Sequence, residues 1–262
     1  MSTLPFTVDQ TVGFFLVFTR IISVLALLPV FGSQSVPPQV KVGFGLILTL
    51  LLHPFSGAAA ALSGTAFSLP LFGLMLVKEV MVGIAIGFIA SMLFTAVQFA
   101  GRLVDTEMGF GFVELVDPFT EETVTVWGQL QVIVFTIIFL LFNGHYFMLL
   151  ALQRSFELVP LLGARLPDGK VAMHLIGLTG ALFEVALRFA APVYVPLILS
   201  EIALGAVART VPQINIFFVG MPLKIVIGLG TAFLVMPALS GLFRRYVENL
   251  VQDIWKLLFL MA

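Results

Sequence analysis

The sequence contains no cysteine, little charge and no excess of basic residues. The absence of cysteine excludes disulfides, thiolate nucleophiles and cysteine-containing metal sites. The net charge of −1 argues against nucleic acid as a partner, because binding to phosphates requires a basic surface. Charged residues make up only 10% of the chain, against about 25% in an ordinary soluble domain. So few polar side chains do not cover a water-facing surface, and the chain therefore needs lipid, partner proteins or both around it.

Hydrophobic residues make up 60% of the chain and are grouped in long runs. A membrane-spanning helix needs about 20 apolar residues, and at least four of the runs reach that length. This pattern predicts an all-α, polytopic membrane protein of long, kinked helices and helical hairpins, with residues 1–262 as a single membrane domain. The runs lie at 11–31, 40–52, 69–100, 124–151, 171–207 and 216–243.

Two runs are longer than one simple crossing requires. As single helices, 69–100 would measure about 48 Å and 171–207 about 55 Å, against a hydrocarbon core of about 30 Å. Pro192 and Pro196 are predicted kink sites in the second run. In the first run, Gly83 and Gly87 are four residues apart, and we expect them to let another helix approach closely.

The last segment, 244–260, has apolar residues at helical spacing and polar residues on the opposite face. It is predicted to be an amphipathic helix. Two interpretations remain open, a helix lying on the membrane surface and a docking surface for a partner.

No pattern typical of catalysis is present. The sequence has no HExxH, GxSxG or EF-hand pattern, and the glycine spacing in 163–170 (GARLPDGK) does not fit a phosphate-binding loop. His53, His145 and His174 are far apart in the sequence and are interpreted as structural. We therefore predict no catalytic residue, no metal, no cofactor and no enzymatic activity.

Eight ionisable residues lie inside or at the ends of the apolar runs. Charges at a bilayer centre are costly, so most of these are expected to be buried in pairs, to face protein or to face water. Glu184 and Arg188 are four residues apart and can pair on one helical face. Structural pairing and a polar conduit or proton relay are both open interpretations. The eight are Arg20, Lys78, Glu79, Glu184, Arg188, Glu201, Arg209 and Lys224.

Residues 101–123 (GRLVDTEMGFGFVELVDPFTEET) combine many acids with alternating glycine and phenylalanine. Glycine frees the backbone, and exposed phenylalanine is disfavoured in water. The segment is interpreted as a flexible, acidic loop with an apolar tip, which folds into a pore or against a partner. The candidate residues are Glu107, Gly109, Phe110, Gly111, Phe112, Glu114, Asp117 and Pro118.

Residues 212–224 (PQINIFFVGMPLK) are predicted to form a turn between helices at the membrane edge. Pro212, Gly220 and Pro222 are expected to break the helix on both sides of an apolar stretch. Gln213 and Asn215 supply side-chain hydrogen bonds where the backbone loses its own.

These segments together resemble the FliR family of export-gate proteins in flagellar and virulence type III secretion. The resemblance covers nearly the whole chain. It is carried by FTRIISVLALLPVFG (18–32), PPQVKVG (37–43), GRLVDTEMGFG (101–111) leading to Asp117-Pro118, and PQINIFFVGMPLK (212–224).

The resemblance implies a subunit of a helical ring, in which one FliR-like chain joins several copies of FliP and FliQ around the pore where export begins. It implies a FliP-like part, 1–170, and a FliQ-like hairpin with the amphipathic tail, 171–262. It assigns a pore plug to 106–123. It further implies FlhB, FlhA and exported unfolded flagellar proteins as partners. The implied location is the bacterial inner membrane within the flagellar basal body, projecting towards the periplasm, with contacts to lipid.

Two alternatives from other classes remain open. One is a secondary transporter that uses buried Glu184, Arg188 and Glu201. The other is a purely structural scaffold that seeds assembly of the ring.

Overall fold

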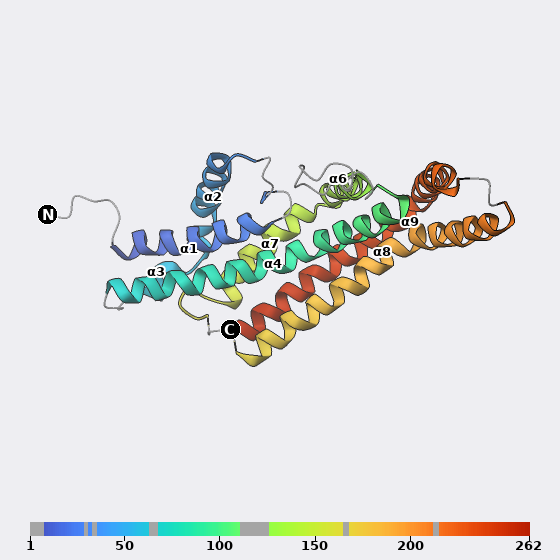
Figure 1. Ribbon diagram of the computed structural model, residues 1–262. Helices are drawn as coiled ribbons and strands as arrows, with labels where there is room; N and C mark the ends of the chain where they lie inside the picture. The colour runs from blue at the N-terminus through green and yellow to red at the C-terminus, as the bar shows by residue number, and fades with distance from the viewer. Residues whose placement is uncertain are drawn as a thin grey trace. The chain divides into compact units, whose positions relative to one another are not determined.

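The computed structural model describes residues 8–28, 31–32, 36–62, 68–110, 126–164, 168–211 and 215–262. Within these ranges the chain is helical and contains no strand, which confirms the predicted all-α class (Figure 1). The helices are α1 (Val8–Leu27), α2 (Pro38–Leu52), the 3-10 helix η1 (His53–Phe55), α3 (Ala58–Leu62), α4 (Leu69–Met108), α6 (Val126–Leu141), α7 (Gly144–Leu158), α8 (Gly169–Thr210) and α9 (Ile216–Met261).

Among the described residues, five helices are long and apolar enough to cross a membrane, and the bent pair formed by α6 and α7 is a further candidate. This number confirms the polytopic prediction. The longest are α4 with 40 residues, α8 with 42 and α9 with 46. Each exceeds the roughly 20 residues of a simple crossing. The overlong runs predict this for α4 and α8, whereas α9 is long because it also includes the tail.

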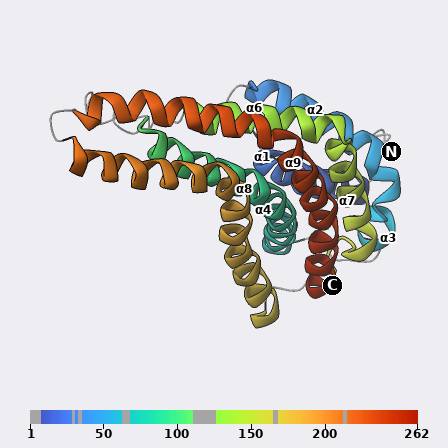
Figure 2. The ribbon, with the colours of Figure 1, turned by 90° about the vertical axis from the view of Figure 1, so that its right-hand side faces the viewer.

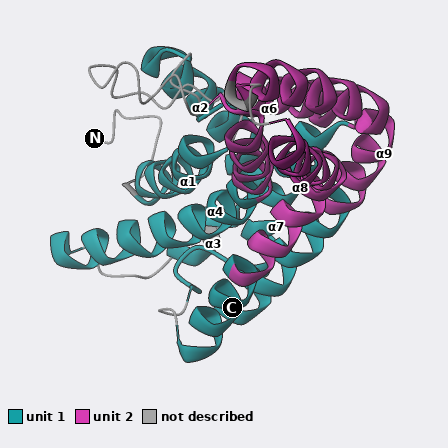
Figure 3. Ribbon diagram, turned by 45° about the vertical axis from the view of Figure 1, so that its right-hand side comes forward, with its two compact units in different colours: residues 1–92, 143–179, 247–262 teal, residues 93–142, 180–246 magenta. Residues whose placement is uncertain are grey.

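The chain forms two compact units (Figure 3). Unit 1 comprises Met1–Met92, Asn143–Thr179 and Val247–Ala262, and unit 2 comprises Leu93–Phe142 and Gly180–Tyr246. The helices α4, α8 and α9 contribute residues to both. The division at residue 170 that the resemblance implies remains a prediction.

In unit 1, α1 packs against α2, α3 and α4. The contact with α4 uses the two glycines identified from the sequence. A Cβ atom at Gly83 would lie 2.6 Å from Ser23 Cβ, and one at Gly87 would lie 2.7 Å from Leu27 Cβ. Any larger residue would force the helices apart, so the close approach predicted for Gly83 and Gly87 is confirmed.

Unit 2 has an aromatic core contributed by four helices. Phe135 of α6 lies 4.7 Å from Phe243 of α9 and 5.3 Å from Phe189 of α8, measured between ring centroids. Phe94 of α4 makes edge-on contacts with Phe139 and Phe243. Tilted and edge-on pairs are the favoured geometries for aromatic rings, and they fix the order in which the helices pack. Figure 2 shows α8 and α9 side by side, with α6 next to α9.

The apolar run 124–151 divides into two helices, α6 and α7, with a break between Leu141 and Gly144. Asn143 lies at the break with a left-handed φ of 56° and is followed by Gly144. Asparagine tolerates this conformation better than most residues, and the Asn-Gly pair is the signal of a turn in the sequence.

The prediction that Gly220 and Pro222 end the helix is wrong. Both lie inside α9, which continues to Met261, so the tail is not a separate helix. A proline removes one backbone hydrogen bond, and apolar membrane helices tolerate this loss because neighbouring groups satisfy the freed carbonyl.

The tail is amphipathic as predicted, but its apolar face is covered by the chain itself. Glu248 and Gln252 are exposed on the other face. This burial accounts for the apolar stripe without a membrane surface or a partner. The buried residues are Val247, Leu250, Ile254, Leu257 and Leu258.

Candidate functional site: charged clusters in the two units

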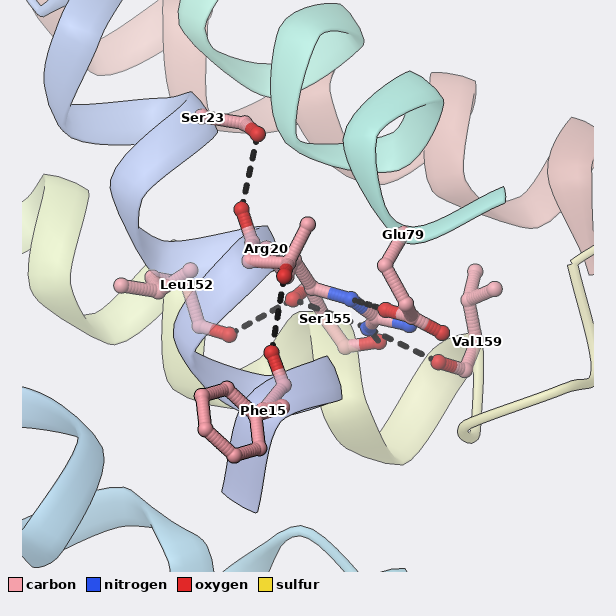
Figure 4. Close-up of polar contacts among 8 residues, drawn as sticks. Phe15, Arg20, Ser23, Glu79, Leu152, Ser155 and Val159 are labelled. Carbon is pink, nitrogen blue, oxygen red and sulfur yellow. Dashed lines mark hydrogen bonds and ion pairs between the residues drawn. The ribbon is translucent and has the colours of Figure 1, made fainter. Parts of the chain in front are cut away.

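Unit 1 encloses an ion pair between α1 and α4. Arg20 Nε donates to Glu79 Oε2 at 2.5 Å, and the two side chains are 0% and 1% exposed (Figure 4). Arg20 Nη1 donates to the carbonyl oxygens of Ser155 and Val159, both at 2.9 Å. The guanidinium also lies 4.5 Å from the ring centroid of Phe156. One side chain of α1 therefore joins α4 and the end of α7.

The end of α7 is a suitable place for this cation. The last carbonyls of a helix have no partner within the helix, and the helix dipole favours positive charge there. Val159 is the C-cap residue of α7, and Ser155 lies in its last turn. Because a buried charge is tolerated only when it is paired and hydrogen-bonded, we interpret Arg20 and Glu79 as the structural centre of unit 1.

Lys78 and Glu79 are neighbours in the sequence but contact different groups, as adjacent residues on a helix must. Lys78 Nζ donates to the carbonyl oxygen of Leu162 at 3.5 Å. Leu162 has a positive φ of 73° in the turn after α7. The lysine therefore ties this turn to α4.

Unit 2 contains a second charged group, here named the Lys224 cluster, formed by Glu107, Tyr194, Glu201 and Lys224. Lys224 Nζ of α9 lies 3.1 Å from Glu201 Oε2 of α8 and 3.8 Å from Glu107 Oε2 of α4. Tyr194 Oη donates to Glu107 Oε1 at 3.2 Å. The cluster therefore joins the last turn of α4 to the hairpin of α8 and α9.

The Lys224 cluster is more open than the Arg20 centre. Lys224 and Glu107 are 17% and 21% exposed, and Glu201 is 59% exposed. One ammonium lies between two carboxylates, so the charges do not balance within the cluster. A partly hydrated lysine with two acceptors can strengthen its contact with one as it loses the other.

The end of α4 differs from the sequence prediction. The acidic loop predicted from the residues begins at residue 101, and the plug that the resemblance implies begins at residue 106, whereas α4 continues to Met108. Gly109 has a left-handed φ of 89°, Phe110 N donates to Asp105 O, and Gly109 N donates to Thr106 O. This is a Schellman motif, in which glycine ends the helix because it adopts positive φ without steric cost. Glu107 is therefore helical.

Methionines fix this end of α4 against α9. A Cβ atom at Gly228 would meet the side chain of Met108, and one at Gly109 would lie 3.3 Å from Met221 Cε. Met108 is fully buried. The small residues and the flexible thioethers make a close contact beside the Lys224 cluster.

The ion pair of Glu184 and Arg188 is not buried in the chain, which corrects the grouping made from the sequence. The two side chains are 63% and 58% exposed, with Arg188 Nη2 2.5 Å from Glu184 Oε1. Arg209 is also exposed. Their face of α8 does not point into the core of unit 2, and a surface pair on one helix satisfies itself at i and i+4.

Some predicted site residues lie outside the described part of the chain. Asn215 is not one of them, since the described part includes it. It precedes α9, and its carbonyl oxygen accepts a hydrogen bond from Phe218 N at 3.1 Å. The residues outside the described ranges are Gly111, Phe112, Glu114, Asp117, Pro118, Pro212 and Gln213.

Sequence reasoning missed the roles of two residues, Tyr194 in the Lys224 cluster and Asp105 at the end of α4. Tyr194 lies in an apolar run, and nothing in the sequence links it to Glu107 across 87 positions. Asp105 lies among the acids of the predicted loop, yet the residue is 3% exposed and its carboxylate accepts two backbone hydrogen bonds. Its position four residues before Gly109 is the only local signal that it belongs to a helix end. Within the described ranges, no group of three acidic or histidine side chains is placed to hold a metal ion.

Comparison with known proteins covers almost the whole chain. The family described as bacterial export proteins, family 1, matches residues 11–250. The flagellar biosynthetic protein FliR of Bacillus subtilis is 31% identical over 257 residues, covering 97% of this chain and 98% of that protein. FliR of Pectobacterium carotovorum is 29% identical over 94% of this chain and 90% of its own length.

FliR of Escherichia coli gives a similar result, with 29% identity over 91% of this chain and 88% of that protein. A family match over most of the chain and a relative above 30% identity over nearly its full length agree with each other. The chain therefore belongs to bacterial export protein family 1, the family of the flagellar biosynthetic FliR proteins.

Proposed function

We propose that the chain is a non-enzymatic core subunit of the flagellar type III protein export gate. It forms the secretion pore with FliP and FliQ subunits, and its segment 106–123 supplies the plug of the closed pore. Unfolded flagellar proteins pass through the ring when the plug moves aside. FlhB and FlhA are further partners at the bacterial inner membrane, in the basal body, where the assembly projects towards the periplasm. The energy comes from a partner ATPase and the proton gradient.

The observation that carries this proposal is an ionised pair on an otherwise apolar, exposed helix face. Glu184 and Arg188 are surrounded on α8 by Phe183 and Leu187, which are 53% and 58% exposed. Lipid tails favour the two apolar side chains and disfavour the charges. Protein neighbours accommodate both, which supports partner subunits as the surroundings of this face.

The apolar surface of unit 2 supports the same conclusion. On α9, Phe233 is 82% exposed and Leu234 is 76% exposed. They line a hollow together with Trp127 and Leu130 of α6. A large exposed apolar surface of this kind marks a protein interface or a membrane contact.

Support for the plug assignment comes from where the segment begins. Its first residues belong to the last turn of α4, which the Lys224 cluster connects to α8 and α9. The Schellman motif at Gly109 ends the helix abruptly, so the chain leaves α4 at a defined position. A plug needs such a defined origin.

Deletion of 110–118 tests the proposal in cells that carry the complete export gate. We expect increased leakage of ions and small solutes, measured by uptake of a membrane-impermeant dye. As a matched control, the full-length segment with Glu114→Gln and Asp117→Asn keeps its bulk and should leak less than the deletion. Unchanged leakage and unchanged export in the deletion variant would contradict the plug role.

The alternatives predict different results. A secondary transporter that uses Glu184, Arg188 and Glu201 would move ions when the purified chain alone is placed in liposomes. A structural scaffold would fail to assemble after the deletion instead of leaking. Co-purification with FliP and FliQ distinguishes the transporter from the other two functions.

A further inference from the structure

Asp105 caps a helix to which it does not belong. It lies in the last turn of α4, and its Oδ1 and Oδ2 accept hydrogen bonds from Trp127 N and Gly128 N, both at 2.8 Å. These amides are near the start of α6. The first amides of a helix have no partner within that helix, and a carboxylate is favoured there by the helix dipole.

The two helices are also in backbone contact one turn before Asp105. A Cβ atom at Gly101 would collide with Gly128 Cα and would lie 3.2 Å from Gln131 Oε1. Gly101 and Asp105 are four residues apart and lie on the same face of α4. Trp127 and Gln131 are 5% and 2% exposed, so the contact excludes water.

This geometry relates directly to segment 111–125, because α4 and α6 are the helices on either side of it. Phe110 N donates to the carbonyl oxygen of Asp105, while the side chain of the same residue holds Trp127 and Gly128. One aspartate therefore contacts the chain immediately before the segment and immediately after it.

We infer that Asp105 is a positioning residue of the export gate. It fixes the end of α4 to the start of α6, and it thereby holds together the two helix ends that flank segment 111–125. The inference rests on the proposed function for its role in export. The contact itself does not depend on that function.

The experiment measures the distance between the end of α4 and the start of α6, independently of export. Because the chain contains no natural cysteine, Thr106→Cys and Val126→Cys place two spin labels specifically, one on each helix. Both lie beside the contact of Asp105 with Trp127 and Gly128, here named the clamp. Thr106 and Val126 are both exposed. Electron paramagnetic resonance on the labelled chain within the assembled export complex then reports the distance distribution between the helix ends.

We expect a single narrow distribution in the parent chain and a broad one in Asp105→Ala, which loses both acceptors. Asp105→Asn keeps one acceptor oxygen and should give an intermediate width. Gln252→Ala, on the exposed face of the tail of α9, is the control and should leave the distribution narrow. If Asp105→Ala fails to assemble, the Asp105→Asn variant still tests the inference by the same measurement.

Dye uptake by the same variants separates this inference from the proposed function. A broadened distribution with increased leakage supports both. A broadened distribution without leakage supports the clamp and contradicts the plug role of the segment. A distribution that stays narrow in both Asp105 variants overturns the clamp, whatever the leakage.

Discussion

The two charged clusters of this protein show two ways of keeping ionised groups in an apolar chain. In unit 1, Arg20 and Glu79 are enclosed completely, and the guanidinium has backbone acceptors from α7 as well as the carboxylate. In unit 2, Lys224 is shared between two carboxylates, one of which is 59% exposed. The first arrangement fixes helices to each other, whereas the second leaves charge available at the surface.

The difference between the units lies in how they hold their charges, because both expose large apolar side chains, among them Phe55 of unit 1 at 68% and Phe233 of unit 2 at 82%. In unit 1 the two central charges pair with each other, although Arg20 Nη2 and Glu79 Oε1 are buried without a hydrogen-bond partner. Unit 2 displays the Glu184 and Arg188 pair and the apolar residues Phe233 and Leu234. We therefore expect substitutions in the buried centre of unit 1 to act on stability and substitutions on the surface of unit 2 to act on assembly.

The largest effect is expected for Arg20→Ala. It leaves Glu79 buried without its cation, which destabilises a protein by about 3–5 kcal/mol. The measurement is the midpoint of denaturant unfolding of the purified chain in detergent. The double variant Arg20→Met and Glu79→Leu removes both charges and should be more stable than Arg20→Ala. A double variant that is as unstable as the single one would contradict the interpretation of this pair.

The next effect is expected for Gly83→Ala. The added Cβ atom would lie 2.6 Å from Ser23 Cβ and 2.7 Å from Arg20 O, so α1 must move away from α4. Overpacking of this kind costs about 1–3 kcal/mol. Gly73→Ala on the same helix is the matched control, because no atom lies within 4 Å of its Cβ position. The control should be neutral or slightly stabilising, and equal losses in the two variants would rule out the packing argument.

A smaller effect is expected for Lys224→Ala. It leaves Glu107, which is 21% exposed, with only Tyr194 as a hydrogen-bond donor, at a cost of about 1 kcal/mol. Adding Glu107→Gln should restore part of the loss, since the amide needs no cation. The unfolding midpoints of the three variants check this. A loss as large as that of Arg20→Ala would remove the distinction between the two clusters.

The smallest effect on stability is expected for Glu184→Gln. The pair is exposed and lies on one helix, and such pairs contribute little because water and salt screen them. The unfolding midpoint of the isolated chain should stay that of the parent. A clear drop would mean that this face of α8 is covered within the chain, which would contradict the account of unit 2.

Much of the fold was predictable because apolar runs and their lengths set the helices. The glycines at 83 and 87 indicated a close helix contact, which the structure has. Helix ends were less predictable. Asp105 and Glu107 are polar, so composition placed them in a loop, yet Gly109 ends α4 by its positive φ after both of them. Pro222 predicts a helix break, although α9 accommodates it.

The charged site was predictable residue by residue but not as an arrangement. Arg20 and Glu79 were both recognised as costly charges, but their pairing spans 59 positions and depends on how α1 packs on α4. The acceptors from α7 are backbone carbonyls, which every residue has, so no sequence signal marks them. No sequence signal marks Tyr194 as a member of the Lys224 cluster either.

The most direct test of the account is co-purification of FliP and FliQ with the tagged chain from membranes, carried out with Phe233→Glu beside the parent. The parent is expected to bring down both partners. Phe233→Glu, which places a charge on the exposed apolar face of unit 2, is expected to lose them while keeping the unfolding midpoint of the parent. A parent chain that is recovered alone, well folded and active without these partners would contradict the central claim that other subunits cover unit 2.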